Sequence, residues 1–182
     1  MRLFLGIPLA AEVIGELAST VARLRSDGDG LRWTARESWH VTLRFLGNVG
    51  WEEYNCVVAR LRELRVPTVH MRLEHLGFFD RSGILYAGVT VTPELLLLQR
   101  RVTTATRLCG FAPDARPYQP HITLARSKGN GQRQGIAALK TKISRPQTFT
   151  GFVAEEFLLY ESFLGPGGSR YEIRERFALG GS

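Results

Sequence analysis

One four-residue pattern, histidine followed by a β-branched apolar residue, threonine and leucine, occurs twice in this chain. It reads HVTL at residues 40–43 and HITL at residues 121–124, and it uses two of the four histidines. Alternate side chains of a β-strand point to the same face, so each pattern places His and Thr on one face and apolar residues on the other. We therefore expect two strands that are each buried on one face only.

The sequence around these patterns is typical of alternating helices and antiparallel strands in an α+β fold. The expected strands lie at 2–7, 39–46, near 69–79, 84–91, 121–126, 152–163 and 170–179. The expected helices lie at 9–25, at 52–65 and after Pro93, and the expected loops at 26–30, 113–120, 127–135 and 165–168. Because the order of elements is similar on either side of residue 92, we expect one domain, 1–182, duplicated internally as about 1–92 and 93–182.

Net charge and cysteine content indicate the kind of partner and the cellular compartment to expect. The formal net charge of +7 favours an anionic partner such as nucleic acid, although a basic surface also aids solubility. Cys56 and Cys109 belong to no metal-type cluster, so we expect no disulfide and a reduced, cytoplasmic setting. Polar residues and Pro8 interrupt the apolar N-terminus, and no apolar run is long enough to cross a membrane.

Two imidazoles beside two hydroxyls suit acid–base chemistry at a phosphate. One histidine can act as a base while the other acts as an acid, and threonine hydroxyls can donate hydrogen bonds to phosphate oxygens. A single His-x-Thr is commonplace, but two copies with matching flanks favour one shared site. His70 and His75 have no partners at metal-binding spacing, so we interpret them as structural or exposed and expect neither metal nor cofactor.

Four segments carry a resemblance to a known family. They are RLFLGIPL at 2–9, HVTLRFLGNV at 40–49, YQPHITLAR at 118–126 and GPGGSRYEIRERFAL at 165–179. On these segments the chain resembles, nearly end to end, the RNA 2',3'-cyclic phosphodiesterases, or 2'-5' RNA ligase-like proteins, of the two-histidine phosphoesterase superfamily. The resemblance implies two pseudo-symmetric lobes of mainly antiparallel sheet, with outer helices and a central cleft.

The resemblance also implies roles for the repeated residues. His40 would be the proton donor, His121 the proton acceptor, and Thr42 and Thr123 would hold the phosphate oxygens. The implied reaction opens a 2',3'-cyclic phosphate end of RNA with water and leaves a 2'-phosphate. Some members also join RNA ends through a 2'-5' linkage. We expect a monomer whose partner is RNA carrying such an end.

Four further residues are candidates for substrate binding. Arg126 stands where relatives carry a phosphate-binding arginine, but strict alternation points it away from the histidine unless the strand bulges, and the alternative is a surface arginine. Phe45 either stacks on the base or faces the core. Arg44 shares the His40 face by alternation, so it either contacts phosphate or is exposed. Tyr118 either shapes the approach to His121 or belongs to a rigid turn.

Two other functions stay open at this stage. One is an RNA- or nucleotide-binding module that has the fold without turnover. The other is a phosphodiesterase for small cyclic nucleotides or for 2'-5' oligonucleotides. The presence of all four motif residues favours an enzyme, and the basic charge favours longer RNA.

Overall fold

Two four-stranded antiparallel sheets carry the two histidine strands. The computed structural model describes residues 1–128, 133–144, 147–165 and 168–181. Its elements are β1 (Arg2–Pro8), α1 (Ala11–Leu24), β2 (Leu31–Trp33), the short 3-10 helix η1 (Arg36–Ser38), β3 (His40–Asn48), α2 (Trp51–Arg62), β4 (Val69–Met71), β5 (Leu73–Phe79), β6 (Ile84–Val89), α3 (Pro93–Arg107), β7 (His121–Ser127), α4 (Arg133–Ile143), β8 (Phe152–Ala154), β9 (Glu156–Gly165) and β10 (Gly168–Ala178).

The strand order assigns the two histidine strands to different sheets. The first sheet has the order β10-β9-β1-β3 and the second the order β2-β7-β6-β5, while β4 and β8 form a separate two-stranded ladder. Neighbouring strands are antiparallel in all three sheets. The expected α+β class with mainly antiparallel sheets is confirmed. Each four-stranded sheet combines strands from both sides of residue 92, and an internal duplication at that boundary stays a prediction.

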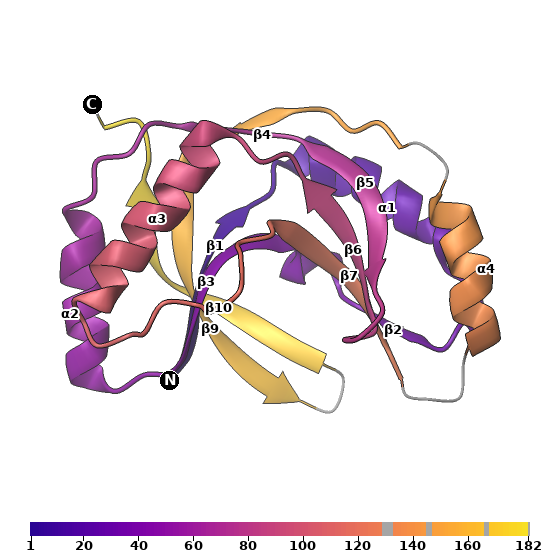
Figure 1. Ribbon diagram of the computed structural model, residues 1–182, viewed down its shortest axis with the longest axis horizontal. Helices are drawn as coiled ribbons and strands as arrows, with labels where there is room; N and C mark the ends of the chain where they lie inside the picture. Colours follow the sequence, from indigo (N-terminus) through magenta and orange to yellow (C-terminus); the bar gives the residue numbers. More distant parts are fainter. Residues whose placement is uncertain (129–132, 145–146, 166–167, 182) are drawn as a thin grey trace.

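The helices lie outside the two sheets (Figure 1). α2 and α3 pack together and contact β10 and β3 of the first sheet, whereas α4 contacts β5 of the second sheet and packs against α1. The apolar residues of the repeated patterns, Val41 and Leu43 in β3 and Ile122 and Leu124 in β7, are at most 2% exposed. The buried faces of β3 and β7 therefore belong to the core, and the faces with His and Thr are turned away from it.

Local sequence signals explain how two of the helices begin. At α3 the Thr92 side chain accepts a hydrogen bond from the Leu95 amide at 3.2 Å, and Pro93 occupies the first turn, where no amide donor is needed. At α2 the Glu53 carboxylate accepts a hydrogen bond from the Gly50 amide at 2.7 Å. These contacts satisfy donors that a helix leaves free at its N-terminus.

Several expected element boundaries differ from the structure. The strand expected near 69–79 is divided into β4 and β5, and the one expected at 152–163 is divided into β8 and β9. β2 and α4 were not predicted from the sequence, and α4 begins inside the loop expected at 127–135. For the turn expected at 165–168, Gly165 pairs with Gly168, and residues 166–167 lie outside the described residues.

The prediction that the two cysteines are unpaired is wrong. Cys56 in α2 forms a disulfide with Cys109, which follows α3, and the two are separated by 53 positions in the sequence. The pairing depends on the packing of α2 against α3, which no local pattern reveals. Closing a loop of this length stabilises the folded state by about 4 kcal/mol in the chain-entropy model.

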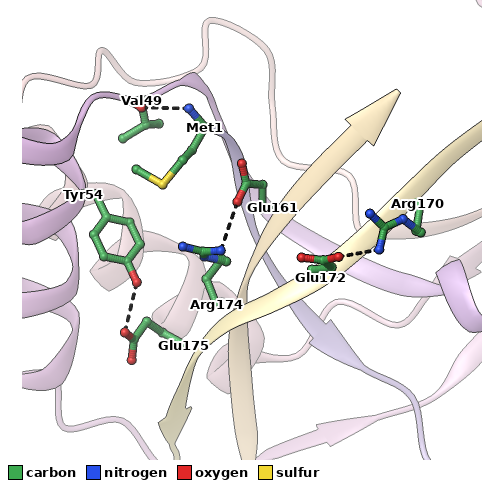
Figure 2. A network of polar contacts seen from close by, with 8 residues as sticks. All are labelled: Met1, Val49, Tyr54, Glu161, Arg170, Glu172, Arg174 and Glu175. Carbon is green, nitrogen blue, oxygen red and sulfur yellow. Dashed lines mark hydrogen bonds and ion pairs between the residues drawn. The ribbon is translucent and has the colours of Figure 1, made fainter. Parts of the chain in front are cut away.

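Charged contacts hold β10 to α2 and to β9 (Figure 2). The Tyr54 hydroxyl of α2 donates to Glu175 Oε1 at 3.0 Å, and Arg174 pairs with Glu161 of β9 at 3.4 Å. The Met1 amino group donates to the Val49 carbonyl at 3.1 Å and so fixes the start of β1 beside the end of β3. These contacts keep the strands of the first sheet in the register that builds the face around His40.

Candidate active site

The two histidine strands lie next to each other although they belong to different sheets. β3 contacts β7 (Figure 1), and the Tyr118 hydroxyl donates to the Thr42 carbonyl at 3.2 Å. This hydrogen bond connects the segment before His121 directly to the strand of His40. Burial raises the pKa of Tyr118 above its ordinary value, so the hydroxyl remains a donor at neutral pH. Tyr118 therefore has a positioning contact between the two motifs.

Both imidazole rings are held in the same way. His40 Nδ1 lies 2.7 Å from the Ser38 carbonyl oxygen, and His121 Nδ1 lies 2.8 Å from the Gln119 carbonyl oxygen. A carbonyl oxygen only accepts, so each Nδ1–H donates and each Nε2 faces away from the backbone as an acceptor. In the absence of a ligand, His40 Nε2 accepts a hydrogen bond from the Thr42 hydroxyl at 3.1 Å. In both cases the carbonyl acceptor stands two residues before the histidine. This arrangement fixes the tautomer of both neutral rings without using another side chain.

Aromatic rings from the neighbouring strands enclose the His40 ring. The Phe4 ring of β1 lies 4.6 Å from it, between centroids, and Phe4 stacks on Tyr160 of β9 at 4.9 Å. Tyr171 of β10 meets the His40 ring edge-on at 5.3 Å. Gly6 of β1 makes room for the ring, because a Cβ there would lie 3.2 Å from His40 Cδ2. These residues were not predicted as part of the site, since their place beside His40 follows from strand register.

The surroundings of His121 repeat this arrangement in the second sheet. Tyr86 of β6 lies 5.7 Å from the His121 ring, and Phe79 of β5 meets the same ring edge-on at 5.1 Å. Tyr86 and Phe79 stack at 4.0 Å, as Phe4 and Tyr160 do in the first sheet. Gly77 makes room here, because a Cβ at this position would overlap the Tyr86 ring.

Burial changes the protonation of His40. Desolvation is the main cause that lowers the pKa of His40 to about 4; the hydrogen bond to the Ser38 carbonyl acts in the opposite direction, and the charge of His121 adds to the lowering. The influence of His121 on His40 indicates that the two imidazoles are close enough to interact electrostatically. In the absence of a ligand, His40 is therefore neutral at pH 7.

Each histidine strand has a β-bulge immediately after its threonine. In β3, Thr42 pairs with Gly6 and Arg44 pairs with the next residue of β1, Leu5, so Leu43 has no partner of its own. Paired residues of antiparallel strands share a face, so Phe45, which pairs with Phe4, lies on the face of His40. Phe45 is 66% exposed, and its ring lies 5.8 Å from Phe4. A core position for Phe45 is excluded.

The bulge in β7 is equivalent and places Arg126. Thr123 pairs with Tyr86 and Ala125 pairs with Leu85, so Leu124 is the extra residue. His121, Thr123 and Arg126 pair with alternate residues of β6, which places all three on one face. Arg126 is exposed on this face. The structure therefore contains the bulge that a functional Arg126 requires, at the position that corresponds to Phe45.

The same bulge excludes Arg44 from substrate contact. Strict alternation placed Arg44 on the His40 face, but the extra residue turns it to the opposite side, where it is 2% exposed. Its guanidinium donates to the carbonyl oxygens of Thr103, Phe111 and Ala112 at 3.2, 2.9 and 2.6 Å. Arg44 thus anchors the end of α3 and the segment that follows it, and the hypothesis of a phosphate contact is wrong.

The two remaining histidines occupy different surroundings. His75 is exposed, and its ring lies over Gly88, where a Cβ would come within 2.8 Å of His75 Cε1. Because Gly88 pairs with His121, His75 is on the face of the second sheet that carries the motif. His70 lines an open cavity of about 810 Å³ beside β4 and β8 together with Arg72 and Phe149, and none of the predicted site residues lines that cavity.

A metal site would need three or more His, Cys, Asp or Glu side chains close together, and the part of the chain that the structure describes contains no such group. Independence of metal ions stays a prediction. Within the same residues, no helix is both long enough and apolar enough to cross a membrane.

Comparisons with known proteins agree with this architecture. The chain belongs to the 2'-5' RNA ligase superfamily, whose family model matches residues 14–162. Relatives named RNA 2',3'-cyclic phosphodiesterase include one from Escherichia coli, 29% identical over 98% of this chain and 96% of that protein. Another, from Thermus thermophilus, is 30% identical over 100% of this chain and 91% of that protein. The chain is an enzyme of this family, as the resemblance in the sequence indicated.

Solved structures show the same fold. The structure of E. coli LigT complexed with 3'-AMP has a TM-score of 0.82 at 28% identity and covers 98% of this chain and 97% of that one. A structure of a Thermus thermophilus protein has a TM-score of 0.83 at 27% identity, and the match covers 100% of both chains. The two-lobed fold expected from the resemblance is therefore that of the LigT-like phosphoesterases.

Proposed function

We propose that this enzyme opens 2',3'-cyclic phosphate ends of RNA with water and leaves a 2'-phosphate. The names of its relatives support this substrate, and solved structures of E. coli LigT contain 3'-AMP and phosphate. The observation that carries the proposal is the matched anchoring of His40 and His121 on adjoining strands. Opening a cyclic phosphodiester needs one base and one acid at the same phosphorus.

The proposed reaction uses the Nε2 atom of each ring. Water attacks the phosphorus while His121 Nε2 accepts a proton from it, and the bond between phosphorus and the 3' oxygen breaks. The 3' oxygen takes its proton from His40 Nε2, and the phosphate remains on the 2' oxygen. Thr42 and Thr123 donate hydrogen bonds to the nonbridging oxygens, where negative charge increases in the transition state. Both proton transfers involve the histidines, so the proposed mechanism uses no metal or cofactor.

Substrate binding would prepare His40 for its role as the acid. The free protein holds this ring neutral at pH 7, because its pKa is about 4. A phosphate anion opposite the ring favours the charged form and raises the pKa. Protonation of His40 would thus accompany binding of the phosphate. After one turnover His121 carries the extra proton, and exchange with water restores the starting state.

Two exposed residues complete the proposed substrate site. Phe45 offers a ring on the His40 face on which a base can stack, a contact that contributes roughly 1–3 kcal/mol. Arg126 offers a guanidinium on the His121 face for phosphate. Their equivalent positions after the two bulges would place the base toward the first sheet and the phosphate charge toward the second.

The superfamily description favours a second candidate activity, 2'-5' ligation of RNA. In this reaction an RNA hydroxyl replaces water as the nucleophile, and the same acid and base serve. Turnover of small cyclic nucleotides or of 2'-5' oligonucleotides, and binding without turnover, are the competing functions. A substrate panel that contains each of these compounds distinguishes them.

The test is hydrolysis of an RNA with a 2',3'-cyclic phosphate end in the presence of a chelator, followed by end-group analysis. We expect a 2'-phosphate, and each of His40→Ala and His121→Ala reduces the rate at least about a hundredfold. His70→Ala is the matched control, because His70 lies in β4, which pairs with β8 and not with either motif strand. A 3'-phosphate product, a strict need for metal, or full activity in either motif variant would refute the proposal.

We further propose that the protein acts as a monomer on RNA in the cytoplasm. An RNA substrate supports an intracellular location, whereas the cysteine content no longer does, because Cys56 and Cys109 are joined. Disulfides are rare in the cytosol of most organisms. Thiol labelling of freshly lysed cells without reductant reports the state of this pair, and sedimentation of the purified protein reports the oligomeric state.

A further inference from the structure

The strand beside the second histidine strand places a second arginine on the same face as Arg126. Arg32, the middle residue of β2, pairs directly with Arg126 of β7. Because paired residues of antiparallel strands share a face, both guanidinium groups project from the face that carries His121 and Thr123. Leu31 and Trp33, on either side of Arg32, contact the core instead, in agreement with this orientation.

The two arginines form a pair of like charges without a counter-charge among the described residues. Both side chains are exposed, and neither has a hydrogen bond or an ion pair to any other residue that the structure describes. The acidic residue nearest to Arg32 in the sequence, Asp29, accepts from the Leu31 amide at 2.9 Å and from the Trp33 indole at 2.8 Å. Like charges directly opposite each other destabilise a sheet. An anionic ligand would remove that cost.

The position of Arg32 suggests which anion it meets. Thr123 and Arg126 follow one another on this face of β7. Arg32 lies opposite Arg126 on β2, the edge strand of the sheet, and neighbouring strands are about 4.8 Å apart. In the proposed function the motif residues and Arg126 hold the reacting phosphate. An RNA end has one further phosphate next to its terminal nucleoside, namely the phosphodiester on the 5' side.

We propose that Arg32 and Arg126 form a cationic subsite in which Arg32 binds the phosphodiester 5' to the terminal nucleotide. This inference rests on the proposed function and specifies its substrate class, which is RNA of at least two nucleotides rather than a nucleoside 2',3'-cyclic phosphate. A contact to the backbone phosphate adds affinity without reading the base. The enzyme then recognises the end of a chain and discriminates against free cyclic nucleotides.

The test compares two substrates with the same terminal base. One is a dinucleotide with a 2',3'-cyclic phosphate end, and the other is the corresponding nucleoside 2',3'-cyclic phosphate. We expect the wild-type protein to prefer the dinucleotide and Arg32→Gln to lower kcat/KM for it about ten-fold, mainly through KM, as expected for loss of one charged hydrogen bond. For the nucleoside substrate kcat/KM changes by less than about two-fold, and Arg32→Lys recovers part of the dinucleotide preference.

Two further measurements separate recognition from a structural role. With the dinucleotide, the slope of log kcat/KM against log salt concentration should be shallower by about 0.7 in Arg32→Gln than in the wild type. This is the change expected when one phosphate contact to a single strand is lost. Without RNA, the variant melts at the same temperature as the wild type or higher, because a like-charge pair has been removed. Arg107→Gln is the matched control, since Arg107 is exposed at the end of α3 and its substitution removes the same charge from a different element.

Three results overturn the subsite: equal losses on both substrates, no loss on either, or a lower melting temperature in Arg32→Gln. If the wild type opens neither substrate, the proposed function is refuted, and the subsite is then tested by measuring RNA affinity instead of turnover. In that case a labelled RNA tetranucleotide ending in a 2'-phosphate should bind Arg32→Gln about ten-fold more weakly in fluorescence anisotropy. Equal affinity would refute the subsite independently of the reaction.

Discussion

The lowered pKa of His40 has a measurable consequence for stability. In the unfolded chain this histidine has an ordinary pKa near 6.5, whereas in the folded protein desolvation lowers the pKa to about 4. Between these values the unfolded state binds the proton more tightly, so the folded state loses stability as the pH falls. The loss is negligible above pH 7.5 and reaches about 2 kcal/mol at pH 5 and about 3 kcal/mol at pH 4.

The perturbation that isolates this effect is His40→Gln, which cannot titrate. Urea unfolding at pH 7.5 and at pH 4 gives the loss of unfolding free energy for wild type and variant. We expect the wild type to lose about 3 kcal/mol more than His40→Gln over this interval. Arg107→Gln should behave as the wild type does, because the arginine lies in α3 and its charge is constant over this range.

An NMR titration of the His40 ring checks the same claim directly. The free protein should give a pKa near 4, and added inorganic phosphate should raise it, since an anion favours the protonated ring. Equal losses of stability in wild type and His40→Gln, together with an ordinary pKa in the free protein, would show that water solvates the ring. His40 would then not depend on its substrate to become protonated, and its proposed activation as an acid by substrate binding would be refuted.

Three further predictions concern other parts of the structure. Phe45→Ala should raise KM for RNA about ten-fold by loss of stacking. Trp51→Ala, which removes an equally exposed ring from α2, should leave KM unchanged. An equal KM in Phe45→Ala and the wild type would exclude stacking. Cys56→Ser should lower the unfolding free energy by about 4 kcal/mol, and a change below about 1 kcal/mol would contradict the loop-closure argument. Gly77→Ala should lose about 1–3 kcal/mol and much of kcat, because it displaces the aromatic ring beside the second histidine. Gly15→Ala is the control, because a Cβ at this helix position meets no neighbouring atom, and it should leave the unfolding free energy unchanged or raise it. Equal changes of unfolding free energy in the two variants would show that packing against Tyr86 is not the cause.

The sequence was most informative where local rules determine the outcome. The four motif residues could be placed on one face of each strand, because His40 with Thr42 and His121 with Thr123 precede any irregularity. Alternation fails beyond the threonines, since a bulge adds one residue and reverses the faces that follow. For that reason the assignment of Arg44 was wrong.

Features that depend on tertiary contacts could not be predicted. The pairing of Cys56 with Cys109 requires α2 to lie against α3, and the place of Arg32 requires β2 to pair with β7. β2 has three residues, too few for a periodic pattern to be recognised. The aromatic residues around each histidine come from strands distant in sequence, so only the register of the sheets identifies them.

The strand order of the first sheet has a consequence for biosynthesis. β1 and β3 are made early, but β9 and β10, which supply the tyrosine rings against His40 and cover the edge of β1, begin only at Glu156. A polypeptide that ended shortly before this residue would contain both motifs and an uncovered sheet edge. We expect such a product to be prone to aggregation and to lack the tyrosine rings that lie against His40, so the surroundings of His40 are complete only after β9 and β10 have been made.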